Sequence, residues 1–422
     1  MNGNQITRHR YSIIPLVFIV LLSGVIVPSA SSTTLSDPGN RGPCEFEKLN
    51  LDINGIETVF YIPVTDTCGT WTTAPFPGLV FAHGFTMFGF TDGVADVDGN
   101  GEHLASWGYV VAIPSLPDEA EPRITDVREI LDAMQELTNQ SGSVLYQIID
   151  PDSLAVVGYS LGGFTALATA ARDDRIDVIV ALDPVYHEGG FGGEGPPIWH
   201  PENEGENIDM PTGILGSPPS DCNAAADFED IFDYVGATHK ASYLISEASH
   251  CDFLDPGNSF CSFFCTGTTS PAHTRLSQRY MTSWFNYYLL LRPEFYNNLF
   301  GPELAQDVGS GAIEPVIFTQ VKGLHGASFG NSAILTWAIY HQPILAGYNV
   351  YRRDSGGEYP SQPLVKLGVV GSYSDLDIES GQGYFYEVCS YDLGGNQHLC
   401  SEEIFVRGGE DHPLFLPVVL KR

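Results

Sequence analysis

Basic residues are scarce in this chain. It holds 19 lysines and arginines against 52 aspartates and glutamates, which gives a formal net charge of −33 at pH 7 over 422 residues. Nucleic acids and anionic membrane surfaces are bound by clustered Lys and Arg side chains. The composition therefore argues against both as partners and fits a soluble extracellular protein.

Hydrophobic runs of the ~20 residues that a membrane-spanning helix needs are also missing. The apolar run Ile13–Val27 has 15 residues, follows Arg8 and Arg10, and precedes the small residues 29–32. This pattern predicts a secretory signal peptide over residues 1–32, with an uncleaved anchor as the alternative. We expect a secreted mature chain without a membrane span, which begins with a flexible leader over residues 33–44.

Cysteines are few, but their number is even. All eight follow the predicted signal peptide, and an even number in an exported chain predicts disulfides. Cys44–Cys68 and Cys389–Cys400 are the expected pairs, since each pair brackets two predicted strands. The other four can pair in three ways, between which the sequence does not choose: Cys222, Cys251, Cys261 and Cys265.

Metal-binding patterns are incomplete. Cys261-x3-Cys265 has no second Cys/His pair of finger type nearby, so we predict no zinc site. Residues 96–101 match the first half of a calcium loop, but Trp107 stands where a bidentate Glu is needed. We interpret this stretch as a turn and helix cap, with a helix beginning at His103, and keep calcium as the lesser alternative. No metal and no cofactor are expected.

One short stretch organises the chain. The apolar residues 154–157 lead directly into Gly158-Tyr-Ser-Leu-Gly162, and an alanine-rich run follows. Gly-x-Ser-x-Gly between a buried strand and a helix is typical of a nucleophile elbow, a tight turn that exposes the serine hydroxyl. The glycines leave room two positions before and after the serine. We therefore predict that Ser160 is a nucleophile; the alternative is a chance match in a loop.

Strands and helices alternate through most of the chain. After two strands within residues 45–63, we predict strands at 78–82, 109–113, 154–157, 176–182, 212–216 and 241–246, and helices at 125–138, 161–171, 227–234 and 275–291. This alternation predicts an α/β fold over residues 45–310, a mostly parallel sheet with helices on both faces. The Gly-, Pro- and acid-rich residues 186–209 predict an irregular loop able to cover the site.

A histidine and two aspartates stand at the ends of predicted strands. His250 follows the last of them, Asp183 follows the strand after the elbow helix, and Asp221 follows the next strand, the commoner place for the acid in this fold. The order Ser, acid, His is that of the α/β-hydrolase fold. We predict His250 as the general base and Asp183 as the acid that orients it, with Asp221 as the alternative.

Two backbone N–H groups are expected to hold the oxyanion that forms when the serine attacks a carbonyl. One follows the nucleophile and the other lies in the loop after the third strand. These positions correspond to Leu161 and Phe85, and His83 beside the latter is expected to be structural.

Four segments carry a resemblance to a known group: 83–85, 158–163, 181–185 and 249–254. Over roughly residues 45–292 the chain resembles the chlorophyllase-like hydrolases and their relatives, the plasma-type platelet-activating-factor acetylhydrolases and bacterial cutinase-like polyesterases. In the first two groups the acid sits in an Asp-Pro-Val-like segment. The resemblance therefore implies Asp183 over Asp221, and the segment after Ser249 implies His250.

From about Ile313 the pattern changes to short alternating strands. The strand at Trp337, the alternation Tyr384-x-Tyr386-x-Val388 and the turn at 392–396 resemble a fibronectin type III domain over residues 313–407. The resemblance implies that Trp337 and the tyrosines form a core. Such a β-sandwich would space or anchor the enzyme, or dock it to a surface or polymer. The apolar tail, residues 408–422, is a last strand or a recognition tag.

Together these features predict a secreted serine hydrolase that cleaves small or polymeric carboxylic esters through an acyl-enzyme. The first alternative is a polyester- or lipid-directed hydrolase of the same mechanism. The second is a catalytically idle extracellular binding protein.

Overall fold

The structure is a computed structural model that describes residues 37–86, 91–186, 200–257, 259–265, 267–316, 321–339 and 345–409. The predicted signal peptide and most of the C-terminal tail lie outside these ranges, as do residues 187–199 of the predicted covering loop.

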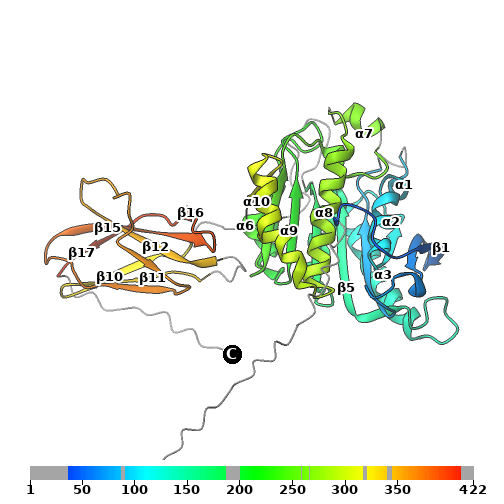
Figure 1. Cartoon of the computed structure of the whole chain (residues 1–422), viewed down its shortest axis with the longest axis horizontal. Helices are drawn as coiled ribbons and strands as arrows, with labels where there is room; N and C mark the ends of the chain where they lie inside the picture. The colour runs from blue at the N-terminus through cyan, green and yellow to red at the C-terminus, as the bar shows by residue number, and fades with distance from the viewer. Residues whose placement is uncertain are drawn as a thin grey trace, which may run out of the picture. The chain divides into compact units, whose positions relative to one another are not determined.

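The larger part of the chain is built on one nine-stranded sheet (Figure 1). Its strand order is β1-β2-β4-β3-β5-β6-β7-β8-β9. The strands are β1 (Phe46–Ile53), β2 (Ile56–Pro63), β3 (Phe76–Ala82), β4 (Val110–Pro114), β5 (Ile149–Tyr159), β6 (Val178–Leu182), β7 (Thr212–Gly216), β8 (Lys240–Ile245) and β9 (Ile313–Val316). The pairs from β4 through β8 are parallel, and the pairs at both edges are antiparallel.

Helices cover both faces of this sheet. The described helices are α1 (Gly93–Asp96), α2 (Asp98–Ser106), α3 (Ala120–Asn139), α4 (Leu161–Ala170), α5 (Pro201–Glu204), α6 (Phe228–Tyr234), α7 (Ser259–Phe264), α8 (Pro271–Tyr288), α9 (Tyr296–Phe300) and α10 (Pro302–Gly309). Alternate strand residues pack on opposite sides: Val156 faces the core under α3 and α4, and Val157 faces the core under α2 and α8. This is the α/β-hydrolase fold.

The sequence patterns explain these elements. All seven residues of β3 are buried, as expected of a central parallel strand covered on both faces. In α3 the buried residues Val127, Ile130, Leu131 and Met134 recur at helical spacing and form one apolar stripe. The predicted strands between residues 45 and 246 and the four predicted helices are confirmed, with ends shifted by a few residues.

Two expectations in this part are wrong. Residues 98–101 already belong to α2, so this helix begins at Asp98 rather than at His103, and only Val97 forms a turn between α1 and α2. The glycines there serve close packing: a Cβ on Gly101 would lie 2.8 Å from the Ile113 side chain. The second error concerns residues 313–316, assigned to the C-terminal domain. They pair antiparallel with β8 and extend the larger sheet as β9, so 241–246 is not its last strand.

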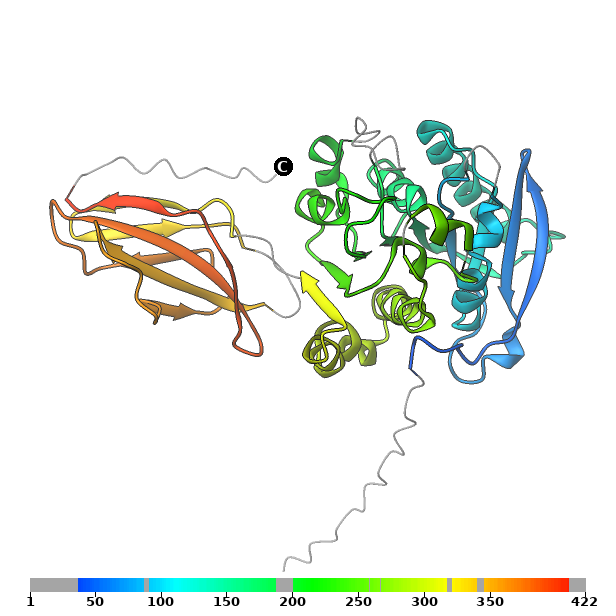
Figure 2. The ribbon, with the colours of Figure 1, turned by 90° about the horizontal axis from the view of Figure 1, so that it is seen from above.

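The C-terminal region is built from antiparallel strands, coloured yellow to red in Figure 2. One sheet holds β10 (His325–Phe329), β11 (Ser332–Thr336) and β14 (Ser372–Asp375); the other holds β12 (Leu345–Asp354), β13 (Val365–Leu367), β15 (Gly383–Asp392), β16 (Gln397–Cys400) and β17 (Ile404–Arg407). Trp337 is buried with its ring 5.6 Å from the ring of Tyr348. The tryptophan therefore belongs to the core, as predicted.

All eight cysteines are paired. The expected disulfides Cys44–Cys68 and Cys389–Cys400 are confirmed. The pairing that the sequence left open is Cys222–Cys265 and Cys251–Cys261. Among the helices of the described ranges, none is both long and apolar enough to cross a bilayer.

Candidate active site

Three polar side chains meet at the carboxyl edge of the parallel strands. Ser160 follows β5, Asp183 follows β6, and His250 opens a short 3-10 helix after β8. Because parallel strands end at the same edge, this edge is where ligands bind in open α/β sheets. The chain thus brings together residues that lie up to 90 positions apart in the sequence.

Ser160 sits on the sharp turn that the glycine pattern predicted. Its backbone has φ 56° and ψ −121°, a conformation that a residue other than glycine rarely adopts. A Cβ on Gly158 would lie 2.0 Å from the Gly162 carbonyl oxygen, and one on Gly162 would lie 1.9 Å from that of Ala82. Both glycines are therefore required for the turn to close against the sheet.

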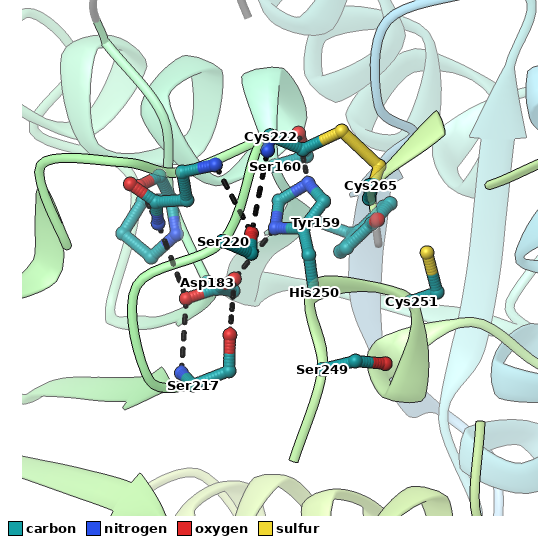
Figure 3. Close-up of polar contacts among 12 residues, drawn as sticks. Tyr159, Ser160, Asp183, Ser217, Ser220, Cys222, Ser249, His250, Cys251 and Cys265 are labelled. Carbon is teal, nitrogen blue, oxygen red and sulfur yellow. Dashed lines mark hydrogen bonds and ion pairs between the residues drawn. A yellow bond between two sulfur atoms is a disulfide. The ribbon is translucent and has the colours of Figure 1, made fainter. Parts of the chain in front are cut away.

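The three side chains form a continuous hydrogen-bonded chain (Figure 3). His250 Nε2 lies 2.9 Å from Ser160 Oγ, and His250 Nδ1 lies 2.5 Å from Asp183 Oδ2. Ser160 is 9% exposed, His250 3% and Asp183 0%. An imidazole between a hydroxyl and a carboxylate is the arrangement that activates a serine for attack on a carbonyl. Asp221, the alternative acid, lies exposed on the segment between β7 and α6.

The Asp183 carboxylate has further donors that the sequence did not reveal. The Ser217 backbone N–H donates to Oδ1 at 3.0 Å, and the Ser217 hydroxyl donates to Oδ2 at 2.9 Å. The Asn223 amide donates to Oδ1 at 3.2 Å. Hydrogen bonds to the ionised form stabilise a buried carboxylate. Ser217 directly follows β7, at the same sheet edge, and this position after a predicted strand is the signal that could have indicated it.

The turn that carries His250 is held by a second buried aspartate. Asp252 accepts hydrogen bonds from the Ser249 N–H at 2.7 Å and from the Ser270 N–H at 2.5 Å. Ser249 and Asp252 form a reciprocal capping box, and Ser270 precedes α8. The histidine turn is thereby fixed to the start of a long helix. The Tyr159 ring packs on His250 with centroids 5.0 Å apart.

Two disulfides surround the same turn. Cys251, next to His250, is bonded to Cys261, and Cys265 is bonded to Cys222. Cys222 precedes Asn223, which donates to Asp183. The second disulfide therefore ties the segment that supports the aspartate to the segment that follows the histidine (Figure 3).

The two positions predicted for the oxyanion amides lie beside the serine. Leu161 is the first residue of α4, where backbone N–H groups are left without helical partners. Phe85 belongs to the segment 83–86 after β3. Gly84 brings this segment close to the elbow, because a Cβ on it would lie 3.1 Å from the Tyr159 ring and 3.4 Å from Ser160 Cβ.

His83 has the structural role that the sequence predicted. Its Nε2 accepts a hydrogen bond from the Leu116 N–H at 2.9 Å, and its Nδ1 lies 2.7 Å from the Gly84 carbonyl oxygen. Burial lowers the pKa of His83 to about 4, so the ring is neutral at pH 7. A neutral ring with its proton on Nδ1 satisfies both contacts and fixes the segment against the loop after β4.

Groups of side chains with metal-ligand spacing offer no free thiolate. Within the described residues they are Cys251, Cys261 and Cys265, and Glu387, Cys389 and Cys400. Every cysteine in them is disulfide-bonded, and metal ligation by cysteine requires the thiolate.

The fold and this geometry define the larger part of the chain as an α/β-hydrolase. Residues 55–262 match a family model described as PET hydrolase-like. Cutinase est1 of Thermobifida alba is 26% identical over 208 residues, which are 48% of this chain and 60% of that protein. Cutinase cut1 of Thermobifida fusca is 24% identical over 170 residues, 40% of this chain and 45% of that protein.

A lipase is similar to a shorter part of the chain. Lipase 1 of Moraxella sp. (strain TA144) is 33% identical over 95 residues, 22% of this chain and 28% of that protein. The chain thus spans about a quarter to three fifths of the length of these relatives. Together with the family model, they show that this α/β-hydrolase region is similar to PET hydrolase-like proteins and cutinases. The finer resemblance to chlorophyllases and acetylhydrolases stays a prediction.

Proposed function

We propose that this protein is a secreted serine hydrolase that cleaves carboxylic esters. The observation that carries the proposal is the unbroken hydrogen-bonded chain from Ser160 through His250 to Asp183. Four disulfides support secretion, since disulfides persist in oxidising compartments.

The roles of the three residues follow from their positions. His250 Nε2 takes the proton of Ser160 Oγ as the serine attacks the ester carbonyl, and then gives it to the leaving alcohol. Asp183 holds the Nδ1 proton and stabilises the imidazolium. Water then attacks the acyl-enzyme with His250 again as base, which releases the acid and restores the serine.

The backbone N–H groups of Phe85 and Leu161 would hold the oxyanion of both tetrahedral intermediates. Preorganised amides of this kind stabilise charge that develops only in the transition state, and loss of one such donor typically costs about 10²–10³ in kcat.

For the substrate, we propose a polyester or a lipid-like ester rather than a small polar one. Cutinases and a lipase are among the relatives, and the family model is described as PET hydrolase-like. Phe85, 38% exposed beside the serine, adds apolar surface where an acyl or aryl group would lie.

For the C-terminal region, we propose a fibronectin type III-like sandwich that docks the enzyme to such a polymer. Phe405 in β17 is 53% exposed, and its ring lies 5.0 Å from that of Phe385 in β15. Arg353 in β12 stacks on Phe385, with its guanidinium carbon 4.0 Å from the ring centroid. Flat aromatic and guanidinium groups suit contact with an apolar polymer surface that carries ester dipoles.

A fluorophosphonate probe tests the nucleophile directly. It should label the wild-type chain covalently, with the adduct on Ser160 by mass spectrometry, and leave Ser160→Ala unlabelled. A folded wild-type chain that takes up no probe would favour the idle binding protein. Release of acid from polycaprolactone film, compared with p-nitrophenyl acetate, butyrate and octanoate, would then separate polymer, lipid and short-chain esters.

A further inference from the structure

A buried arginine lies directly behind the predicted oxyanion hole. Arg123 belongs to the first turn of α3 and is 0% exposed, which is rare for a residue of this charge. Among the described residues its hydrogen bonds reach two carbonyl oxygens and one hydroxyl, and none reaches a carboxylate. A guanidinium withdrawn from water costs free energy unless its donors are satisfied, so its position calls for a reason.

Its partners belong to the two structures that carry the oxyanion amides. One terminal nitrogen donates to the carbonyl oxygen of His83, two residues before Phe85. The Nε–H donates to Thr165 Oγ1 at 3.1 Å, and that hydroxyl donates to the Leu161 carbonyl oxygen at 2.7 Å. A single rigid guanidinium therefore connects the Phe85 segment to the residue that follows the nucleophile.

Two more hydrogen bonds hold the Arg123 side chain and the Phe85 segment in place. The other terminal nitrogen of Arg123 donates to the Pro117 carbonyl oxygen at 2.7 Å. Next to Pro117, Asp118 accepts from the Thr86 N–H at 2.8 Å, on the far side of Phe85. The Phe85 segment is thus held at His83 by the arginine and at Thr86 by the aspartate. Asp118 lies in the loop after β4, and Arg123 lies in helix α3, which follows that loop.

We propose that Arg123 is a positioning residue that sets the Phe85 and Leu161 amides at the separation the oxyanion requires and places a positive charge behind them. The inference rests on the proposed ester hydrolysis and adds a residue to it. Arginine suits this place because its donors are fixed in one plane, whereas a lysine has one ammonium and cannot reach all three partners.

Three variants test the proposal with p-nitrophenyl butyrate: Arg123→Lys, Arg123→Ala and Thr165→Val. Thr165→Val keeps the shape of the side chain but removes the link to Leu161, so it serves even if the arginine variants fail to fold. Arg128→Met is the matched control, since Arg128 lies on the same helix but its side chain is 49% exposed and pairs with Asp173. Circular dichroism confirms folding before kinetics are measured.

We expect kcat to fall about 10- to 100-fold in Arg123→Lys and Thr165→Val, with KM changed less than about threefold, since oxyanion donors act on the transition state. Methylguanidinium should restore part of the activity of Arg123→Ala, and Arg128→Met should match the wild type. Folded variants with kcat within twofold of the wild type, or a loss confined to KM, would overturn the proposal. A wild-type chain as slow as Ser160→Ala would instead reject the proposed function, and the inference with it.

Discussion

The Asp183 carboxylate accepts four hydrogen bonds, and this has consequences at the scale of single residues. Besides His250 it accepts from the Ser217 N–H, the Ser217 hydroxyl and the Asn223 amide. These donors hold the carboxylate in one orientation, which in turn fixes the imidazole that faces Ser160.

Removal of the Ser217 hydroxyl should therefore slow the reaction. A hydrogen bond to a charged group contributes about 1.5–3 kcal/mol, so we expect Ser217→Ala to lower kcat for p-nitrophenyl butyrate roughly 10-fold or more. Ser220→Ala is the control in the same segment, since Ser220 Oγ accepts from the backbone of Cys222 and Asn223 instead. Equal rates for the two variants would contradict the role given to Ser217.

His83 gives a second prediction, on stability against pH. Its pKa of about 4 in the folded chain lies below the ~6.5 of an unfolded histidine, so the unfolded state binds the proton first as the pH falls. The stabilisation is complete above pH ~6.5 and is lost between about pH 6.5 and 4, by roughly 3 kcal/mol.

Urea unfolding of the wild type and of His83→Gln from pH 7.5 to 4 checks this. The difference in unfolding free energy between the two should shrink by about 3 kcal/mol across that window, since glutamine does not titrate. A difference that stays constant with pH would mean that His83 is not held neutral.

Some residues of the site could be predicted from the sequence and others could not. Ser160 lies in a turn whose glycines form a recognisable motif. His250 and Asp183 follow predicted strands, so the proximity of all three residues was predicted. Arg123 and Asn223 lie far in the sequence from the residues they contact, by 40 positions in the bonds to His83 and Asp183. No local pattern marks such contacts, and only the packed chain reveals them.

At the scale of elements, the site depends on two segments without regular pairing in the sheet. The segment from Ser217 to Asn223 supports the aspartate, and the segment after His250 contains α7. The disulfide Cys222–Cys265 joins them across 43 positions. The first segment donates hydrogen bonds to Asp183, and the second follows directly on His250.

Replacement of this disulfide should lower both stability and activity. Closure of a loop of this length contributes up to about 4 kcal/mol by the chain-entropy estimate, so we expect Cys222→Ser/Cys265→Ser to lose roughly 2–4 kcal/mol of unfolding free energy. Its kcat for p-nitrophenyl butyrate should also fall. Cys389→Ser/Cys400→Ser, in the C-terminal sheet, is the control and should keep kcat unchanged. Full activity in Cys222→Ser/Cys265→Ser would show that this disulfide does not hold the two segments in the positions that catalysis needs.

Helices and strands with a strong hydrophobic periodicity were predicted well. Those whose conformation or sheet partner depends on tertiary packing were not. The apolar stripe of α3 and the buried run of β3 are visible in the sequence. Residues 98–101 of α2 are rich in glycine, a poor helix former, yet they are helical because α2 must approach Ile113 and Asp255 closely. Residues 313–316 look like any short strand, and only pairing with β8 shows to which sheet they belong.

At the scale of the whole molecule, the proposal gives the hydrolase and the C-terminal β region different tasks. The triad and the segment that carries the Phe85 amide come from residues 83–250, whereas the Phe385–Phe405 pair lies on β15 and β17. Action on a dissolved ester then depends on the first region alone, and action on a polymer depends on both.

Substitution in the aromatic pair tests this division. Phe405→Ser should leave turnover of p-nitrophenyl butyrate unchanged and reduce adsorption to polyester film severalfold, because it removes an exposed ring from the proposed docking surface. Leu376→Ser is the matched control: Leu376 is 74% exposed and follows β14 in the other sheet. Equal adsorption of the two variants and the wild type would reject docking through this pair.

The most direct test of the whole account compares p-nitrophenyl butyrate hydrolysis by the wild type, Ser160→Ala, Asp183→Asn and Asp221→Asn. We predict that the wild type turns over, that Ser160→Ala is inactive, and that Asp183→Asn loses about 10⁴ in kcat, as expected when the histidine tautomer is no longer held. Asp221→Asn should match the wild type. A wild type no faster than Ser160→Ala, or a collapse of Asp221→Asn with Asp183→Asn intact, would contradict the account.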